Sequence, residues 1–88
     1  MDPVTIDVQA TPNPQAVKAT VNRTLAAQGV TYRAPEPSQP AWAQGLLAIP
    51  GVRQIFAVNN FISVTKDADA AWEDLLPQVE QVLRQTVA

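Results

Sequence analysis

The sequence predicts an α+β fold, in which two helices lie on one face of an antiparallel or mixed sheet to form a two-layer sandwich. Apolar runs predict strands at about residues 4–10, 30–33, 52–58 and 61–66. Apolar residues at helical spacing predict helices at about residues 40–48 and 70–86. A chain of 88 residues supports one modest hydrophobic core, so we expect residues 1–88 to form a single domain.

The first predicted strand ends at a corner that contains two prolines. Its apolar residues alternate with polar ones, at Val4, Ile6, Val8 and Ala10. This is the pattern of a strand buried on one face. Residues 11–14 (TPNP) follow directly. Each proline fixes its own φ and favours extended geometry in the residue before it, so we predict a rigid corner.

Residues 15–29 fit two patterns. Apolar and polar residues alternate from Val17 to Val21, which favours a strand. Val17, Val21 and Leu25 also have the spacing of one helix face, followed by a glycine that suits the end of a helix. The pattern alone leaves strand and helix equally open. Residues 30–33 then predict a short strand.

The predicted helix at residues 40–48 follows Ser38 and Gln39, with proline in its first position. Its apolar stripe consists of Trp42, Leu46 and Ile49. Residues 50–51 (Pro-Gly) end it. Gly45 weakens the helix interior by roughly 0.5–1 kcal/mol relative to alanine, and a closely packed backbone is one explanation for its presence.

Two apolar runs, residues 52–58 and 61–65, are separated only by residues 59–60 (Asn-Asn) and predict a tight β-hairpin. Asparagine tolerates positive φ, which a type I′ turn needs at both central positions. The predicted register pairs Val58 with Phe61, Ala57 with Ile62, Phe56 with Ser63, and Ile55 with Val64. It ends with Arg53 opposite Lys66.

This register gives the hairpin one apolar face and one mixed face. The apolar face, which we assign to the side beneath the helices, consists of Ile55, Ala57, Ile62 and Val64. The mixed face consists of Val52, Gln54, Phe56, Val58, Phe61, Ser63 and Thr65. Phe56 and Phe61 lie diagonally adjacent on it. Either the N-terminal strands or the proline-rich loop cover these rings, or they form an exposed aromatic patch that docks a partner.

The last predicted helix combines an amphipathic stripe with one proline. The stripe consists of Trp72, Leu75, Leu76, Val79, Val82 and Leu83. We expect Asp67 or Asp69 to cap the helix, where negative charge suits the helix dipole. Pro77 removes the hydrogen bond to residue 73. We therefore expect either a kink there or a helical turn at residues 69–75 before a helix from about residue 76.

Composition excludes several classes of site and partner. The chain has no cysteine and no histidine, which excludes disulfides, thiolate and imidazole metal sites, and an Fe–S cluster held by this chain alone. The formal net charge of −2, with six basic residues spread along the chain, argues against a nucleic-acid partner. We find neither a secretory signal pattern nor an apolar stretch of membrane-spanning length, so we expect a soluble, cytoplasmic protein.

The remaining charged residues do not suggest catalysis. The acidic residues Asp67, Asp69, Glu73 and Asp74 lie where a helix start favours negative charge, without the spacing of an EF-hand. The sequence has neither a nucleophile–base pair nor a glycine-rich phosphate loop. We therefore expect no enzymatic activity, no metal site and no cofactor.

Three motifs together resemble one protein family. They are TPNP followed by Lys18, the stretch from LLAIPGV to FAVNNFISVTK at residues 46–66, and W-x-x-L-x-P at residues 72–77. In this order and spacing they resemble the N-terminal domain of Nfu/NifU-type iron–sulfur scaffold proteins. Gln15 replaces a usual asparagine and Ala19 a common aromatic residue, so contacts of those family residues are not carried over.

The resemblance implies a strand at about residues 16–21, in place of the alternative helix. It also implies a domain that occurs either alone or fused to a cluster-binding domain with a CxxC pair. This sequence has no such pair. The resemblance therefore implies a standalone domain that does not bind the cluster.

The resemblance further implies a non-enzymatic protein-interaction module, accessory to Fe–S cluster assembly or delivery, with Fe–S scaffold or recipient proteins as partners. Candidate partner-binding residues are Thr11, Asn13, Lys18, Phe56 and Phe61. For the first three, a rigid turn with a solvated lysine is the structural explanation. The alternatives are an adaptor or subunit domain of the same fold unrelated to Fe–S chemistry, and a small-ligand binder with a cleft between the proline-rich loop and the sheet.

Overall fold

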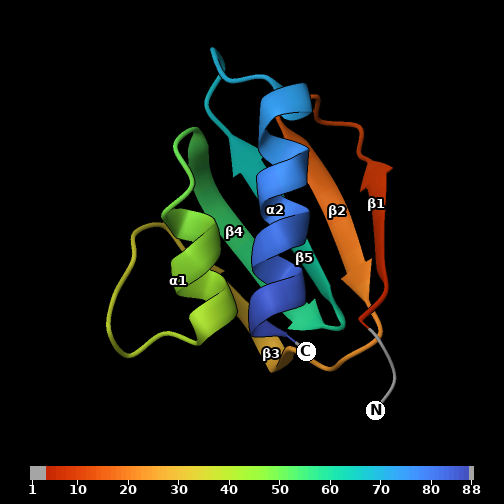
Figure 1. The fold of residues 1–88 in the computed structure, drawn as a ribbon, viewed down its shortest axis with the longest axis vertical. Coiled ribbons are helices and arrows are strands. Elements are labelled where there is room, and N and C mark those ends of the chain that lie inside the picture. The colour runs from red at the N-terminus through yellow and green to blue at the C-terminus, as the bar shows by residue number, and fades with distance from the viewer. Residues whose placement is uncertain (1–3, 88) are drawn as a thin grey trace.

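The computed structural model describes residues 4–87, which form a five-stranded sheet with both helices on one face (Figure 1). In chain order the elements are β1 (Ile6–Ala10), β2 (Ala16–Val21), β3 (Ala26–Tyr32), α1 (Ala41–Leu47), β4 (Val52–Asn59), β5 (Phe61–Lys66) and α2 (Trp72–Thr86). The strand order is β1-β2-β5-β4-β3, and every neighbouring pair is antiparallel. The predicted α+β sandwich is confirmed, with an antiparallel sheet. The ends of the predicted domain, residues 1–3 and 88, lie outside the described residues.

The segment that fits both strand and helix patterns forms strands. In β2, the buried positions alternate with half-buried ones, so that Val17, Ala19 and Val21 face the core. β3 begins at Ala26, before the predicted start at residue 30. Its pairing with β4 is irregular between Ala26 and Val30. Apolar and polar residues therefore do not alternate regularly in the first half of β3, and the sequence pattern does not predict it.

β4 and β5 form the predicted hairpin. The four predicted cross-strand pairs next to the turn are all present. Asn59 has a φ of 54°, whereas Asn60 is not among the described residues with positive φ, so the turn differs from type I′. The β2–β3 connection holds the turn in place. The N–H groups of Val21, the last residue of β2, and of Leu25 in the connection donate to the carbonyls of Asn60 and Asn59, at 2.8 and 2.6 Å.

The predicted register is wrong at the open end of the hairpin. Val52, and not Arg53, lies opposite Lys66, because a bulge shifts the register between Val52 and Gln54. A bulge places one extra residue in a strand and changes the direction of the neighbouring side chains. Val52 consequently packs against the core, whereas regular alternation assigns it to the mixed face.

Both helices begin differently from the prediction. Pro40 is the N-cap of α1 and not its first residue, and neither helix has a side-chain capping hydrogen bond. Ala71, an extended residue, precedes α2. Asp67 and Asp69 do not cap this helix because they belong to a separate turn, in which the Ala70 N–H donates to the Asp67 carbonyl at 3.1 Å.

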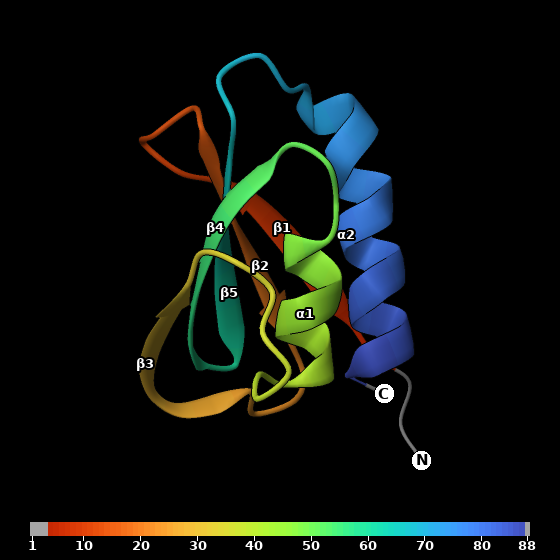
Figure 2. The same ribbon diagram turned by 90° about the vertical axis from the view of Figure 1, so that its left-hand side faces the viewer.

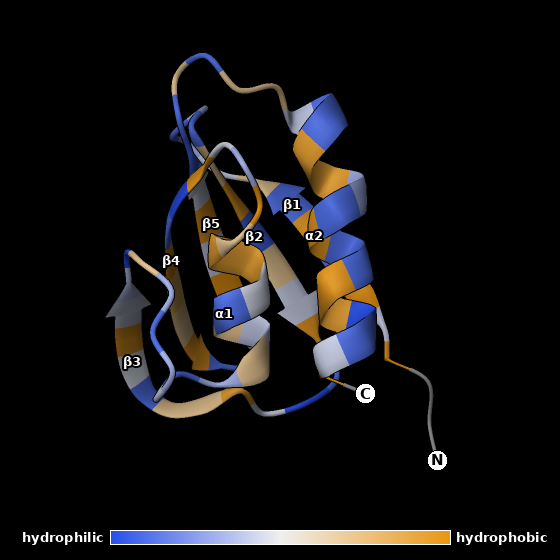
Figure 3. Ribbon diagram, turned by 60° about the vertical axis from the view of Figure 1, so that its left-hand side comes forward, coloured by the Kyte–Doolittle hydropathy of each residue, from blue (hydrophilic) through white to orange (hydrophobic). Residues whose placement is uncertain are grey.

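The core lies between the sheet and the helices (Figure 2). The predicted apolar face is confirmed, since four hairpin residues have no exposed surface: Ile55, Ala57, Ile62 and Val64. The helices contribute a second buried set: Trp42, Ala43, Leu46, Leu47, Leu75, Val79 and Leu83. Apolar residues recur turn by turn along α2 (Figure 3), as its amphipathic pattern predicts. Neither of the two helices in residues 4–87 has the length and apolar character needed to cross a membrane.

Gly45 permits close contact between the two helices. A β-carbon at Gly45 would lie 2.7 Å from Cγ1 of Val82, closer than two carbon atoms can approach without displacement. The neighbour that requires glycine is therefore a side chain of α2, and not the backbone that the sequence suggested.

Pro77 lies inside α2, which runs from Trp72 to Thr86 without interruption. The separate helical turn predicted at residues 69–75 is therefore wrong. Proline has no N–H to bond the Glu73 carbonyl, and its ring crowds that carbonyl. The helix continues because packing of its apolar face outweighs one lost backbone hydrogen bond.

Candidate protein-interaction face

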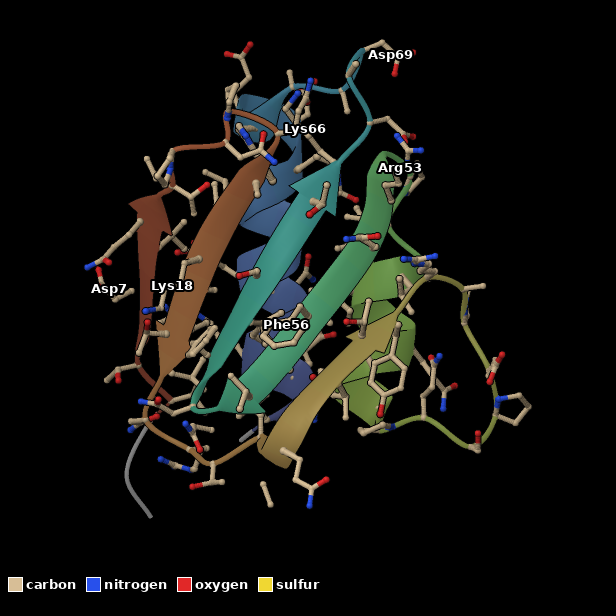
Figure 4. The ribbon with its side chains drawn as sticks, turned by 180° about the vertical axis from the view of Figure 1, so that it is seen from behind. Asp7, Lys18, Arg53, Phe56, Lys66 and Asp69 are labelled. Carbon is tan, nitrogen blue, oxygen red and sulfur yellow. The ribbon has the colours of Figure 1, made fainter. Side chains whose placement is uncertain are left out.

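Both helices lie on one face of the sheet, which leaves the opposite face without a helix (Figures 2 and 4). We call the opposite surface the open face. Strand alternation and pairing assign to it Asp7, Gln9, Lys18, Thr20, Thr31, Gln54, Phe56, Val58, Phe61, Ser63 and Thr65. Directly paired residues lie side by side on one face of a sheet, so these residues form rows across the strands.

Phe56 and Phe61 form an aromatic pair on the open face. Their ring centroids are 6.4 Å apart with an interplanar angle of 48°, within the range of favourable aromatic pairs. Phe56 is 37% exposed, and it is the one exposed large hydrophobic residue among residues 4–87. Its ring packs against Gly29, where a β-carbon would lie 3.0 Å from the ring. Phe56 is therefore partly exposed, with β3 against its ring, whereas Phe61 is half-buried.

Lys18 adds a positive charge beside this aromatic pair. Its Nζ lies 4.5 Å from the centroid of the Phe61 ring, a cation–π distance. Lys18 lies on β2, next to β5, and pairs with Ser63. It makes no ion pair with a carboxylate in residues 4–87. The structure thus brings together three of the five sequence-predicted partner-binding residues: Lys18, Phe56 and Phe61.

Thr11 and Asn13 lie apart, in the corner between β1 and β2. The Thr11 hydroxyl is 2.9 and 3.0 Å from the carbonyls of Asn13 and Ala16, and it accepts a hydrogen bond from the Asn13 N–H at 3.2 Å. The Asn13 side-chain oxygen accepts from the Gln15 N–H at 2.9 Å. Both side chains thus bond within the corner and fix its conformation.

The corner is also attached to the start of α2. The Trp72 indole N–H donates to the Pro14 carbonyl at 3.1 Å, and Lys66 Nζ donates to the Gln15 side-chain oxygen at 2.9 Å. Trp72 is half-buried at the rim of the core, whereas Trp42 is buried within it as predicted. These contacts make the corner part of the sandwich.

Sequence reasoning missed a hollow of about 490 Å³ lined by Arg33, Arg53, Gln54 and Thr65. Alternation along β3 places Arg33 on the same side as Thr31, so the position of Arg33 on the open face follows from the sequence pattern. The position of Arg53 at the hollow could not be predicted, because regular alternation from Ile55 places this residue on the opposite side of the sheet. The bulge between Val52 and Gln54 changes this.

A second hollow of about 250 Å³ lies beside the proline-rich loop and is lined by Pro35, Glu36, Pro37 and Gln44. It lies between this loop and α1, and not between the loop and the sheet as the ligand-binding hypothesis places its cleft. The described residues contain no group of three or more His, Cys, Asp or Glu side chains arranged for a metal ion.

Comparison with solved structures finds the same fold in staphylococcal proteins. The crystal structure of protein SAV1430 from Staphylococcus aureus is similar with a TM-score of 0.84 and 40% identity, over 89% of this chain and 96% of that chain. The solution structure of SeR13 from Staphylococcus epidermidis has a TM-score of 0.62 and 34% identity, over 90% of this chain and 93% of that chain.

Curated relatives include Conserved virulence factor C of Staphylococcus aureus (strain MRSA252), 36% identical over 74 residues, which are 83% of this chain and 20% of the relative. The protein of the same name from Staphylococcus haemolyticus (strain JCSC1435) is 35% identical over 77 residues, 86% of this chain and 21% of the relative. The chain spans about a fifth of the length of these curated relatives.

The family model described as "Scaffold protein Nfu/NifU N terminal" matches residues 6–88. This range begins at β1 and includes every strand and both helices. It also includes the TPNP corner and the hairpin with its exposed Phe56. Together with the sheet order and the hairpin register, the match shows that the chain belongs to the Nfu/NifU N-terminal family.

Proposed function

We propose that this chain is a non-enzymatic protein-interaction module, accessory to Fe–S cluster assembly or delivery, which docks partner proteins through its open face. The supporting observation is the exposed Phe56 ring beside Phe61, with Lys18 over the second ring. Aromatic side chains are the usual anchors of protein interfaces, and an exposed aromatic residue on a sheet without a helix on that side is a surface that a partner can cover.

The proposed role in Fe–S cluster chemistry rests on family membership, because the description of the family model names the N-terminal part of a scaffold protein. In this role the partner supplies the cluster, because Fe–S ligation uses cysteine and occasionally histidine, and this sequence has neither. Fe–S scaffold and recipient proteins are the expected partners. The proposal places the protein in the cytoplasm and assigns it no catalytic step.

The test is quantitative affinity capture from extract of the source organism. The parent chain is compared with the double variant Phe56→Ser/Phe61→Ser and with the control Ala41→Ser/Ala48→Ser, which changes two exposed residues on the helix side. We expect the parent and the control to enrich the same Fe–S assembly or recipient proteins. We expect the open-face variant to lose them, because it lacks both ring anchors.

Thermal melting separates docking from folding in this test. Loss of capture with a melting temperature close to that of the parent supports the proposal. A melting temperature lowered by several degrees with unchanged capture contradicts it, because the rings then serve the fold alone. Capture of proteins unrelated to Fe–S chemistry through the same rings supports instead the alternative of a general adaptor domain.

A further inference from the structure

The hollow beside the aromatic pair continues the rows of the open face. Gln54 pairs directly with Thr65 across β4 and β5. Tyr32 pairs with Ile55, so the following residue, Arg33, falls beside Gln54. Arg33, Gln54 and Thr65 therefore form one row at the end of the sheet, next to the row that contains Phe56.

The bulge adds a second guanidinium to this row. In a regular strand Arg53 shares the face of Ile55, which is fully buried beneath the helices. With the bulge, Val52 packs on the core, and Arg53 lines the hollow with Gln54. Figure 4 shows Arg53 at the end of β4, in the view of the open face. Bulges frequently direct a side chain toward a functional site.

Neither guanidinium has a partner in the described chain. The guanidinium groups of Arg33 and Arg53 make no hydrogen bond, ion pair or ring contact with residues 4–87. Asp67 follows β5 nearby, since its N–H donates to the Gly51 carbonyl at 2.8 Å, but its carboxylate pairs with neither arginine. Of the open-face residues defined above, Asp7 alone is acidic; it lies on the far edge strand and accepts a hydrogen bond from Gln9 at 3.1 Å.

Basic side chains outnumber acidic ones on the open face. The chain has a formal net charge of −2, yet three of its six basic residues, Lys18, Arg33 and Arg53, lie on the open face. The helix α2 carries three acidic residues, Glu73, Asp74 and Glu80, against one basic residue, Arg84. A basic surface on an acidic protein selects a partner segment that is itself acidic.

We propose that the hollow binds a carboxylate side chain from an extended, acidic segment of the partner protein that docks on the open face. The proposal rests on the docking role of the open face and specifies the chemistry of the partner. Guanidinium groups form paired hydrogen bonds with carboxylates, and these are stronger than neutral hydrogen bonds. Gln54 and Thr65 line the same hollow and supply an amide and a hydroxyl donor.

The distance to Phe56 defines a spacing in the partner. Gln54 and Phe56 are two residues apart on the same face of β4, a separation of about 7 Å in a strand. Side chains two positions apart in an extended peptide have the same separation. The expected partner segment therefore has an acidic residue two positions from a large apolar residue, with the apolar side chain against Phe56 and the carboxylate in the hollow.

A nuclear magnetic resonance titration of the ¹⁵N-labelled chain tests this inference. The probe is the end-capped peptide Ser-Glu-Ser-Phe-Ser-Glu-Ser, which presents a glutamate on either side of its phenylalanine. The control peptide has glutamine in place of both glutamates. We expect the acidic peptide to bind about tenfold more tightly than the control, with shifts at Arg33, Arg53, Gln54, Thr65 and Phe56.

Two double variants of the chain complete the experiment. Arg33→Gln/Arg53→Gln removes both guanidinium groups of the hollow, and Arg23→Gln/Arg84→Gln removes two arginines elsewhere. Each takes the formal net charge from −2 to −4, since two positive charges are lost. We expect the hollow variant to bind the acidic peptide about tenfold more weakly than the parent, and the matched control to bind within about twofold of the parent.

Several results would overturn the inference. Equal affinity for both peptides, equal loss in both double variants, or shifts confined to other surfaces would each show that the hollow does not recognise carboxylate. Displacement of the peptide by equimolar inorganic phosphate would assign the hollow to small anions. Concentration-dependent dimers in sedimentation, absent from the hollow variant, would make the acidic α2 of a second copy the occupant.

The partner capture described above distinguishes failure of this inference from failure of the docking role. If the hollow variant retains the captured partner while Phe56→Ser/Phe61→Ser loses it, the docking role stands and the carboxylate site is wrong. If both variants retain the partner, the docking role is wrong as well. Loss of the partner in both variants, but not in Arg23→Gln/Arg84→Gln, supports both.

Discussion

At the scale of single residues, the same kinds of side chain have different roles depending on where their polar atoms bond. The Thr11 hydroxyl and the Asn13 amide are engaged inside the corner between β1 and β2. Lys18, by contrast, contacts a ring on an open surface and has no carboxylate partner in residues 4–87. Binding is therefore better sought at Lys18 than at the corner.

Replacement of Thr11 by valine tests the structural role of the corner. Thr11→Val removes the hydroxyl that serves the Asn13 and Ala16 backbone groups, and we expect a loss of about 1–2 kcal/mol in the free energy of unfolding. The matched control is Thr20→Val, whose hydroxyl makes no hydrogen bond with the described residues. Urea denaturation gives both values. Unchanged stability with loss of partner capture would contradict this role and restore Thr11 as a docking residue.

At the scale of secondary-structure elements, local signals and tertiary contacts compete. In α2, a proline disfavours the helix while its apolar stripe favours it, and the helix forms. In β4, regular alternation would continue through Arg53, but the bulge interrupts it. The common reason is that burial of several apolar side chains outweighs a single backbone irregularity.

Replacement of Pro77 measures this competition. Pro77 is exposed, so Pro77→Ala changes the backbone of α2 and little else. We expect the free energy of unfolding to rise by about 1–2 kcal/mol, because the hydrogen bond to the Glu73 carbonyl is restored and this gain exceeds the entropy that proline removes from the unfolded chain. Guanidinium denaturation provides the measurement. A decrease in stability would show that α2 requires its proline.

At the scale of the whole molecule, the two faces of one sheet have different surroundings. The helix-covered face contains the core, and the open face contains the aromatic pair and the arginine hollow. Neighbouring residues along a strand thus belong to different surfaces, because successive side chains point to opposite faces. Substitutions one position apart should therefore have opposite outcomes.

The pair Ile62 and Ser63 tests this division. Ile62 has no exposed surface, so Ile62→Asp places a carboxylate in the core and should unfold the domain. Ser63→Asp places the same group on the open face and should leave the melting temperature within a few degrees of the parent. Far-ultraviolet circular dichroism during heating measures both. A folded Ile62→Asp variant would mean that the hairpin faces are assigned wrongly.

The sequence by itself determined the two helices, the hairpin and the two faces of the hairpin. Periodicity located both helices, and the alternation on either side of Asn59 and Asn60 placed four residues in the core and Phe56 on the opposite face. These features were predictable because they depend on local chain geometry, in which every second residue of a strand shares a face. Phe56 and Phe61 proved to be neighbours for the same reason, whereas Lys18 reaches Phe61 only through the pairing of β2 with β5.

Only the tertiary structure decided what the helices leave uncovered and which distant residues meet. Exposure of Phe56, the contact of Gly45 with Val82, and the turn that removes Asp67 from the helix cap each depend on packing between separate segments. The hollow depends on it most, because Arg33 and Arg53 come from different strands and meet through a bulge. A pattern search along one chain cannot detect a register shift, which is settled by pairing and burial across the sheet.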